Sequence, residues 1–74
     1  MAEHVRVEIA FDGGQIMGAL VTPESADELE RALAERTVES LTLDADDGRY
    51  AIALPRIVYV KRFTRESRVG FGSA

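Results

Sequence analysis

A short acidic segment, Asp44-Ala45-Asp46-Asp47-Gly48, contains three carboxylates that could bind a metal ion. Closely spaced carboxylates are typical of a calcium loop, but an EF-hand loop needs glycine at its sixth position and glutamate at its twelfth. Here the glycine is fifth and Pro55 is twelfth. The segment therefore fits a tight turn between two strands better than a metal site.

Catalytic residues are equally hard to place. The chain has a single histidine, His4, and no cysteine, so neither a structural zinc site nor a disulfide is expected. No serine has the sequence context of a nucleophile, and the glycine-rich segments Gly13-Gly14 and Gly70-Phe71-Gly72 are too short for a phosphate loop. We therefore predict a protein that is not an enzyme and that needs no cofactor.

The basic side chains are more informative, because they are unevenly distributed. Residues 1–55 carry twelve acidic and four basic side chains, whereas residues 56–74 carry five basic ones and Glu66, for a net charge of −4 overall. The five are Arg56, Lys61, Arg62, Arg65 and Arg68. We expect them to contact an acidic protein surface, or else the phosphates of a nucleic acid, with the interleaved aromatics Tyr59, Phe63 and Phe71 stacked on its bases. The net negative charge repels polyanions and favours the first interpretation.

These residues must be positioned by short strands and one helix. Apolar and polar residues alternate over residues 5–11, which predicts a strand with one buried face. Asp12-Gly13-Gly14 suits a hairpin turn, and residues 16–21 form the returning strand. Gly18 lies in mid-strand, where glycine usually marks a bulge, a bend or a close approach of two backbones.

A helix is predicted over residues 25–36. Ser25 and Glu28 have the spacing of a capping box, and small or large apolar side chains recur at helical spacing after them. Its polar face carries four acidic residues, Asp27, Glu28, Glu30 and Glu35. This face offers a complementary surface for the basic residues of a neighbouring subunit.

The second half of the chain contains three further strands. One is predicted over residues 40–44, and the turn Asp46-Asp47-Gly48 leads to a strand over residues 50–54. After Pro55, residues 57–60 are apolar at every position, which is typical of a strand covered on both faces. Tyr59 is accordingly expected in the core.

The order ββαβββ predicts an α+β domain: a small, strongly bent antiparallel sheet or open barrel, Sm/SH3-like, with one helix. A β-grasp fold is the alternative. We expect one domain over residues 1–74, with residues 64–74 a partly ordered tail. Its predicted core includes Leu29, Leu33, Ile52 and Leu54.

A chain of 74 residues buries a limited share of its surface, so it often needs disulfides, a metal or self-association for stability. Because neither a disulfide nor a structural zinc site is expected here, self-association is the remaining source of extra stability. The predicted oligomer interface consists of Ile57, Val58, Val60 and Phe63, because Val58 and Val60 have no evident cover within one subunit. The sequence has neither a signal-peptide pattern nor an apolar run of about 20 residues, so we expect a cytoplasmic protein without membrane contacts.

Two resemblances support this interpretation. Residues 41–43, 47–49, 56–60 and 67–72, ending in Arg68-Val69-Gly70-Phe71-Gly72, resemble an uncharacterised family of small actinobacterial proteins. The bent hairpin around Gly18 and the late strand over residues 57–60 are similar in architecture to Sm-like barrels. That likeness implies rings assembled through strand edges, and in many cases RNA binding.

We therefore predict a non-enzymatic interaction or assembly module that acts as a homo-oligomer. RNA binding through the basic C-terminal end is the alternative function.

Overall fold

The computed structural model describes residues 3–64, and its elements follow the predicted order ββαβββ. The strands are β1 (Val5–Phe11), β2 (Ile16–Val21), β3 (Ser40–Ala45), β4 (Gly48–Ala53) and β5 (Ile57–Arg62). Helix α1 spans Pro23–Glu35, and a short 3-10 helix, η1 (Leu54–Arg56), separates β4 from β5. Gly13, Gly14 and Gly48 have positive φ angles, so both predicted hairpin turns are confirmed.

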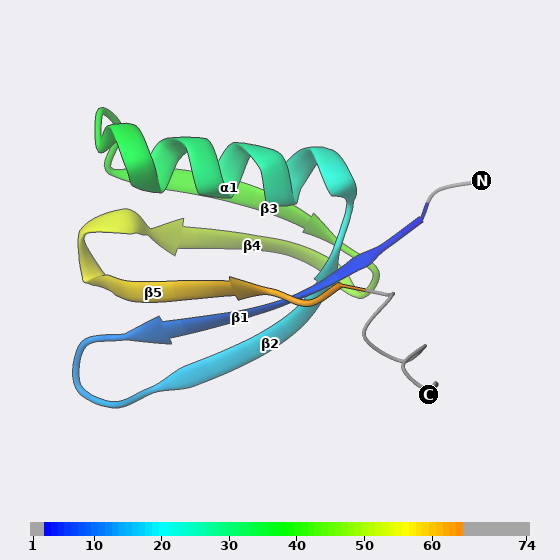
Figure 1. Cartoon of the computed structure of the whole chain (residues 1–74), viewed down its shortest axis with the longest axis horizontal. Coiled ribbons are helices and arrows are strands. Elements are labelled where there is room, and N and C mark those ends of the chain that lie inside the picture. Colours follow the sequence, from blue (N-terminus) through cyan, green and yellow to red (C-terminus); the bar gives the residue numbers. More distant parts are fainter. Residues whose placement is uncertain (1–2, 65–74) are drawn as a thin grey trace.

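The five strands form one sheet in the order β4-β3-β2-β1-β5. Strand β1 lies between β2 and β5, whereas β2 and β3 are joined through the single pair Val21↔Ala45. The β1–β2 and β3–β4 hairpins therefore meet at one end and diverge at the other (Figure 1). The sheet is bent and is not closed, which confirms the predicted α+β class. All four pairings are antiparallel, which excludes the β-grasp alternative with its parallel central strands.

The connection between β4 and β5 carries the chain from one edge of the sheet to the other. Pro55 lies in this connection, where its missing backbone N–H removes no ladder hydrogen bond. The N–H of Leu54 donates to the carbonyl of Glu39 at 2.9 Å, and the N–H of Asp12 donates to the carbonyl of Arg56 at 2.8 Å. These two bonds fix η1 against both hairpins.

Helix α1 begins earlier than predicted and has a different N-cap. Thr22 is the N-cap residue: its hydroxyl accepts from the N–H of Ser25 at 3.1 Å, and Pro23 occupies the first turn. Proline suits that position because its fixed φ is helical and its N–H would be unpaired anyway. The predicted Ser25 cap is therefore wrong. Ser25 is buried, and its hydroxyl accepts from the N–H of Asp44 at 2.9 Å, which ties α1 to β3.

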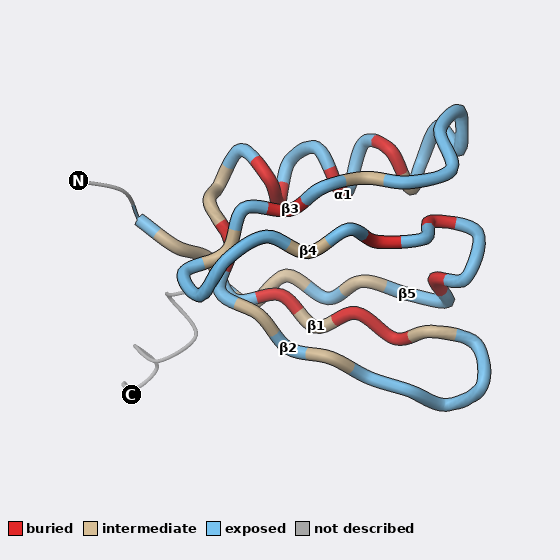
Figure 2. The backbone as a smooth tube through the Cα atoms, turned by 180° about the vertical axis from the view of Figure 1, so that it is seen from behind, coloured by how far each residue is buried: buried red, intermediate tan, exposed pale blue. Residues whose placement is uncertain are grey.

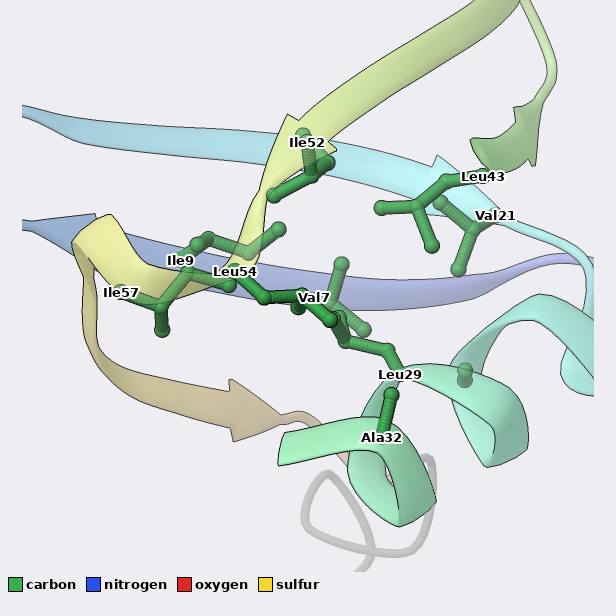
Figure 3. Packing of buried hydrophobic residues seen from close by; sticks show 10 residues of the cluster. Val7, Ile9, Val21, Leu29, Ala32, Leu43, Ile52, Leu54 and Ile57 are labelled. Atoms are coloured by element: carbon green, nitrogen blue, oxygen red, sulfur yellow. The ribbon is translucent and has the colours of Figure 1, made fainter. Parts of the chain in front are cut away.

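The core fills the space between α1 and one face of the sheet. Five of its side chains are almost completely inaccessible: Val7, Ile9, Val21, Leu29 and Leu43. Leu29 and Ala32 of α1 point toward side chains of β1 and η1 (Figure 3). The predicted burial of Leu29, Ile52 and Leu54 is confirmed. Leu33 is half-buried, because it lies near the end of α1 beside a hollow that Val38 and Pro55 also line.

Candidate interaction surface

The residues that alternate with the core on β1, β2 and β5 form the opposite face of the sheet. Val7 and Ile9 point into the core, so Arg6, Glu8 and Ala10 point away from it. Their partners across the sheet follow from the registers of the two pairings. We call this surface the outer face; it comprises Arg6, Glu8, Ala10, Ile16, Gly18, Leu20, Val58, Tyr59, Lys61 and Phe63.

A β-bulge in β5 explains why that strand is apolar at every position. The register shifts between Ala10, which pairs with Tyr59, and Phe11, which pairs with Ile57, so Val58 is the extra residue. Ile57 therefore points into the core with Val60, whereas Val58 and Tyr59 are exposed. The prediction that Tyr59 belongs to the core is wrong, because the bulge changes the alternation that a regular strand would have had.

Large apolar side chains are concentrated on the outer face. Five such side chains are exposed among the described residues, and four of them lie here: Ile16 at 60%, Leu20 at 42%, Val58 at 62% and Tyr59 at 41%. Ile16 and Tyr59 flank Ala10 on either side, which explains why Ala10 is buried although it points outward. The fifth, Val38, lies between α1 and β3.

Polar contacts stiffen the middle of the outer face. The Tyr59 hydroxyl donates to a Glu8 carboxylate oxygen at 2.7 Å. This hydrogen bond raises the pKa of Tyr59, with smaller contributions from desolvation of the hydroxyl and from the Glu8 charge. Lys61 pairs with Glu8 across the strands, where opposite charges are favourable.

One end of the outer face is cationic and aromatic. The Arg6 guanidinium lies 4.8 Å from the centre of the Phe63 ring, and the Lys61 ammonium lies 4.6 Å from the same centre. Both distances are within the range of cation–π attraction. Leu20 lines a hollow next to this end together with His4 and Phe63.

The three predicted basic residues that the structure describes, Arg56, Lys61 and Arg62, do not form one patch. Arg56 binds Asp12 at 3.3 Å, and Arg62 binds Asp27 at 2.8 Å and Glu30 at 3.5 Å. Arg62 therefore contacts the acidic helix of its own subunit, and the hydrogen bond to Asp27 is the main reason why the pKa of Arg62 is raised. Lys61 lies apart from both, on the outer face. Arg65 and Arg68 lie outside the described residues, as does the predicted tail beyond Thr64.

The four predicted interface residues also occupy different environments. Ile57 is 5% exposed and packs in the core of its own subunit, so its side chain is not available to a partner. Val60 is half-buried against the same core, and Phe63 is half-buried at the cationic end. Val58 is the member of the set whose side chain is exposed, at 62%.

Sequence reasoning missed most of the outer face. Arg6, Ile16 and Leu20 were not singled out, although the alternation of β1 and β2 places them opposite the core. Gly18 was expected to mark a bulge, a bend or a close backbone approach. The bulge lies in β5 instead, and the nearest atom to a Cβ added at Gly18 is the Val7 carbonyl oxygen at 3.9 Å.

Within residues 3–64, no cluster of three or more histidine, cysteine or acidic side chains could hold a metal ion. Nor does this part of the chain contain a helix with the length and apolar character needed to cross a membrane. Comparison of the chain with protein-family models, curated proteins and solved structures gave no match. The resemblances to the small actinobacterial proteins and to Sm-like barrels therefore stay predictions.

Proposed function

We propose that this protein is a non-enzymatic assembly module that associates with copies of itself through the outer face. The observation that carries the proposal is the concentration of Ile16, Leu20, Val58 and Tyr59 on one side of three adjacent strands. An apolar patch of this kind, bordered by charged residues, is typical of a protein–protein interface. Covering it would also supply the stability that so short a chain has difficulty in finding within one subunit.

Packing through the face is favoured over pairing through the free edge of β5. A bulge at Val58 interrupts the regular backbone of this edge strand, and the charged side chain of Arg62 turns inward toward α1. Both features are devices by which natural edge strands avoid pairing with another chain. Assembly by sheet-on-sheet contact leaves these features undisturbed, since it uses side chains rather than free backbone groups.

The proposal is tested by measuring molar mass with light scattering over a range of concentrations, at low and high salt. We expect an oligomer that survives high salt, because apolar burial is not screened by ions. Val58→Lys should weaken assembly by at least about tenfold, since the change places a charge in the apolar patch.

Val38→Lys is the matched control, because Val38 is also an exposed valine, at 47%, but lies off the outer face. It should leave the molar mass unchanged. Circular dichroism should show the same secondary structure in both variants. A wild-type protein that is monomeric at every concentration would refute the proposal.

RNA binding remains the second candidate, for one specific reason. Tyr59, Lys61 and Phe63 lie at alternate positions along the outer face, with Arg6 beside Phe63, so aromatic and cationic groups are interleaved on one strand. Such an arrangement suits stacked bases and their phosphates. Against it, Arg56 and Arg62 are already neutralised by acidic residues of the same chain.

This second candidate is tested by titrating the protein with a labelled random-sequence single-stranded RNA at several salt concentrations. Two phosphate contacts, from Arg6 and Lys61, would give a slope of log affinity against log salt of about −1.4. Lys61→Ala should then reduce the slope by about half. No binding at low salt would leave self-assembly as the function.

A cytoplasmic location is part of the first proposal. It is supported by a sequence without cysteine, which cannot form the disulfides that are typical of small secreted domains.

A further inference from the structure

Strand β2 has one paired edge and one open edge. It pairs with β1 over its whole length, from Ile16 to Val21, but with β3 through Val21 alone. The Leu20 carbonyl accepts from the Asp46 N–H at 2.9 Å, so the backbone groups of Leu20 point away from β1. Because these groups alternate in direction along a strand, those of Gly18 and Ile16 point the same way. Within residues 3–64, no backbone group pairs with Ile16 or Gly18 on this side.

This open edge lacks the features that normally prevent strands from pairing. Residues 16–21 include no charged residue and no proline, and their register against β1 is regular. They are exposed or half-buried at every position except Val21 (Figure 2). The free edge of β5, by contrast, has the bulge at Val58 and the ion pairs of Arg62. Since natural proteins interrupt or cover apolar strand edges, we expect the β2 edge to be covered.

The described chain ends near this edge. Thr64 follows β5 and lines a hollow together with Arg6 and Leu20, at the end of the sheet where the two hairpins meet (Figure 1). The path from β5 across β1 and β2 to the open edge is three strand spacings, or about 14 Å. Five extended residues span about 17 Å, so Val69 can reach the edge from Thr64. A chain that continues along the edge then runs antiparallel to β2, because it arrives at the C-terminal end of that strand.

The sequence after Thr64 suits this path in charge. Arg68 lies in the stretch that would cross the sheet, just before the edge is reached. At the point of arrival, Asp46 is bonded to the end of β2 through its backbone, and its carboxylate takes part in no ion pair of residues 3–64. Asp47 beside it accepts from the Tyr50 hydroxyl at 2.9 Å. Asp46 is therefore the carboxylate of this turn that is available to Arg68.

The sequence also suits this path in its apolar pattern. Apolar residues alternate with glycine over Val69-Gly70-Phe71-Gly72. In an added strand, Val69 and Phe71 would lie on one side and the two glycines on the other. On the inner side of β2, Met17 and Ala19 are half-buried at the border of the core. Apolar side chains from an added strand would complete the core at this border.

We propose that residues 69–72 bind the open edge of β2 in the same chain, as a sixth, antiparallel strand with its apolar side chains toward the core. Gly70 then lies opposite Gly18, and the two backbones exchange a pair of hydrogen bonds. The inference goes beyond the proposed self-assembly and does not depend on it. The added strand uses an edge of the sheet, and it leaves Val58 and Tyr59 of the outer face accessible.

Amide hydrogen exchange, followed by NMR in the 74-residue chain, tests the pairing. Gly70→Pro removes a backbone donor and obstructs the ladder, so the Gly18 N–H should exchange at least about tenfold faster than in wild type. The Ala19 N–H, which points toward β1, should exchange at an unchanged rate. Ser73→Pro is the control, because residue 73 lies outside the paired segment, and it should leave the exchange of Gly18 unchanged. An equal Gly18 rate in wild type and Gly70→Pro would overturn the inference.

A spin label on residue 73 tests where the segment lies. The chain has no cysteine, so Ser73→Cys provides a single attachment site. The measurement uses a Val58→Lys background, in which the proposed self-assembly is weakened. The label should broaden the amide signals of Ile16 and Met17 most, because these residues lie at the end of β2 that the added strand approaches last. Broadening that is strongest near Thr64, or equal along the sheet, would overturn the inference.

A mixture distinguishes binding within the chain from exchange between copies. When an isotope-labelled chain without the spin label is mixed with a spin-labelled one, the signals of Ile16 and Met17 should stay sharp. Broadening in this mixture would show that the strand is exchanged between copies and would overturn binding within the chain. If the added strand fails these tests while Val58→Lys still lowers the molar mass, the proposed function stands and this inference alone falls.

Discussion

The two faces of the β2-β1-β5 layer are built from alternate residues of the same strands, yet they differ in almost every property. The inner face carries Val7, Ile9 and Val21, each 1% exposed or less, and α1 covers it. The outer face carries Ile16 and Val58 at 60% and 62% exposed, mixed with Arg6, Glu8 and Lys61. The described chain provides cover for one face and leaves the other open.

This difference shows how many of its apolar side chains so small a fold can bury. A single helix of thirteen residues can cover one side of a five-stranded sheet, and the core cluster contains residues from every strand. Within residues 3–64, no corresponding layer covers the apolar residues of the outer face. The exposed apolar side chains of this face favour binding of a partner there, because large exposed apolar patches are rare on monomeric proteins.

The largest expected effect belongs to the inner face. Leu29→Ala should lower the free energy of unfolding by about 2–5 kcal/mol, because the side chain is fully buried and its removal leaves a cavity between α1 and the sheet. Leu33→Ala, at a half-buried position of the same helix, should cost clearly less. A denaturant melt measures both, and equal losses would contradict the burial of the two residues.

The next largest effect distinguishes two valines of β5, Val58 in the bulge and Val60 beyond it. Val60→Ala should cost about 1 kcal/mol, because Val60 packs against the core, whereas Val58→Ala should change the monomer's stability by less than about 0.5 kcal/mol. Because both variants lose the same two methyl groups, the difference between their unfolding free energies measures how deeply each valine is buried. Equal costs in denaturant melts at low protein concentration would show that β5 is a regular strand without the bulge.

Arg62 gives a smaller effect, since it links the edge of the sheet to the helix through ion pairs. Arg62→Ala should cost about 0.5–1 kcal/mol at low salt, with less than that at 1 M salt, because exposed pairs with Asp27 and Glu30 are screened. Arg49→Ala removes a more exposed pair, with Asp44, and should cost no more than half as much. A loss in Arg62→Ala that does not depend on salt would mean that packing of its aliphatic stem dominates.

The smallest effect concerns the outer-face hydrogen bond between Tyr59 and Glu8. Because the folded-state pKa of Tyr59 is raised above its unfolded value near 10, the stabilisation is present below that value and is lost as pH rises through the folded pKa. In an ultraviolet titration of the Tyr50→Phe variant, the tyrosinate signal should therefore appear above the ordinary range. Glu8→Gln should return it toward the ordinary value, and no movement would show that the bond does not form in solution.

The elements of the fold could be predicted because each has a local signal. Alternation over residues 5–11, glycines with positive φ in the turns, and helical spacing after Pro23 each depend on neighbours in the sequence. The cap was misplaced because Ser25 satisfies a capping-box pattern, although Thr22-Pro23 satisfies an equally local one. Two overlapping start signals cannot be ranked without knowing that Ser25 has a partner, Asp44, on β3.

The candidate surface could be predicted only in part, because it depends on pairing between distant residues. Val58 was identified as uncovered, but Ile57 and Tyr59 were assigned to the wrong sides, since the bulge is visible only in the register of β5 against β1. The basic residues formed a cluster in sequence that the fold separates: Arg56 contacts the first hairpin and Arg62 contacts α1. Charge distribution along a chain does not determine charge distribution on its surface.

The placement of β1 between a sequence neighbour and a distant strand also affects how quickly the chain can fold. Strand β2 follows β1 through a tight turn, so that hairpin can form early. The other side of β1 is completed by β5, and residues joined across that pairing, such as Glu8 and Tyr59, are 51 positions apart. Closing so long a loop costs chain entropy before any contact repays it. During synthesis, the pairing of β1 with β5 can therefore form only after nearly the whole described chain has left the ribosome.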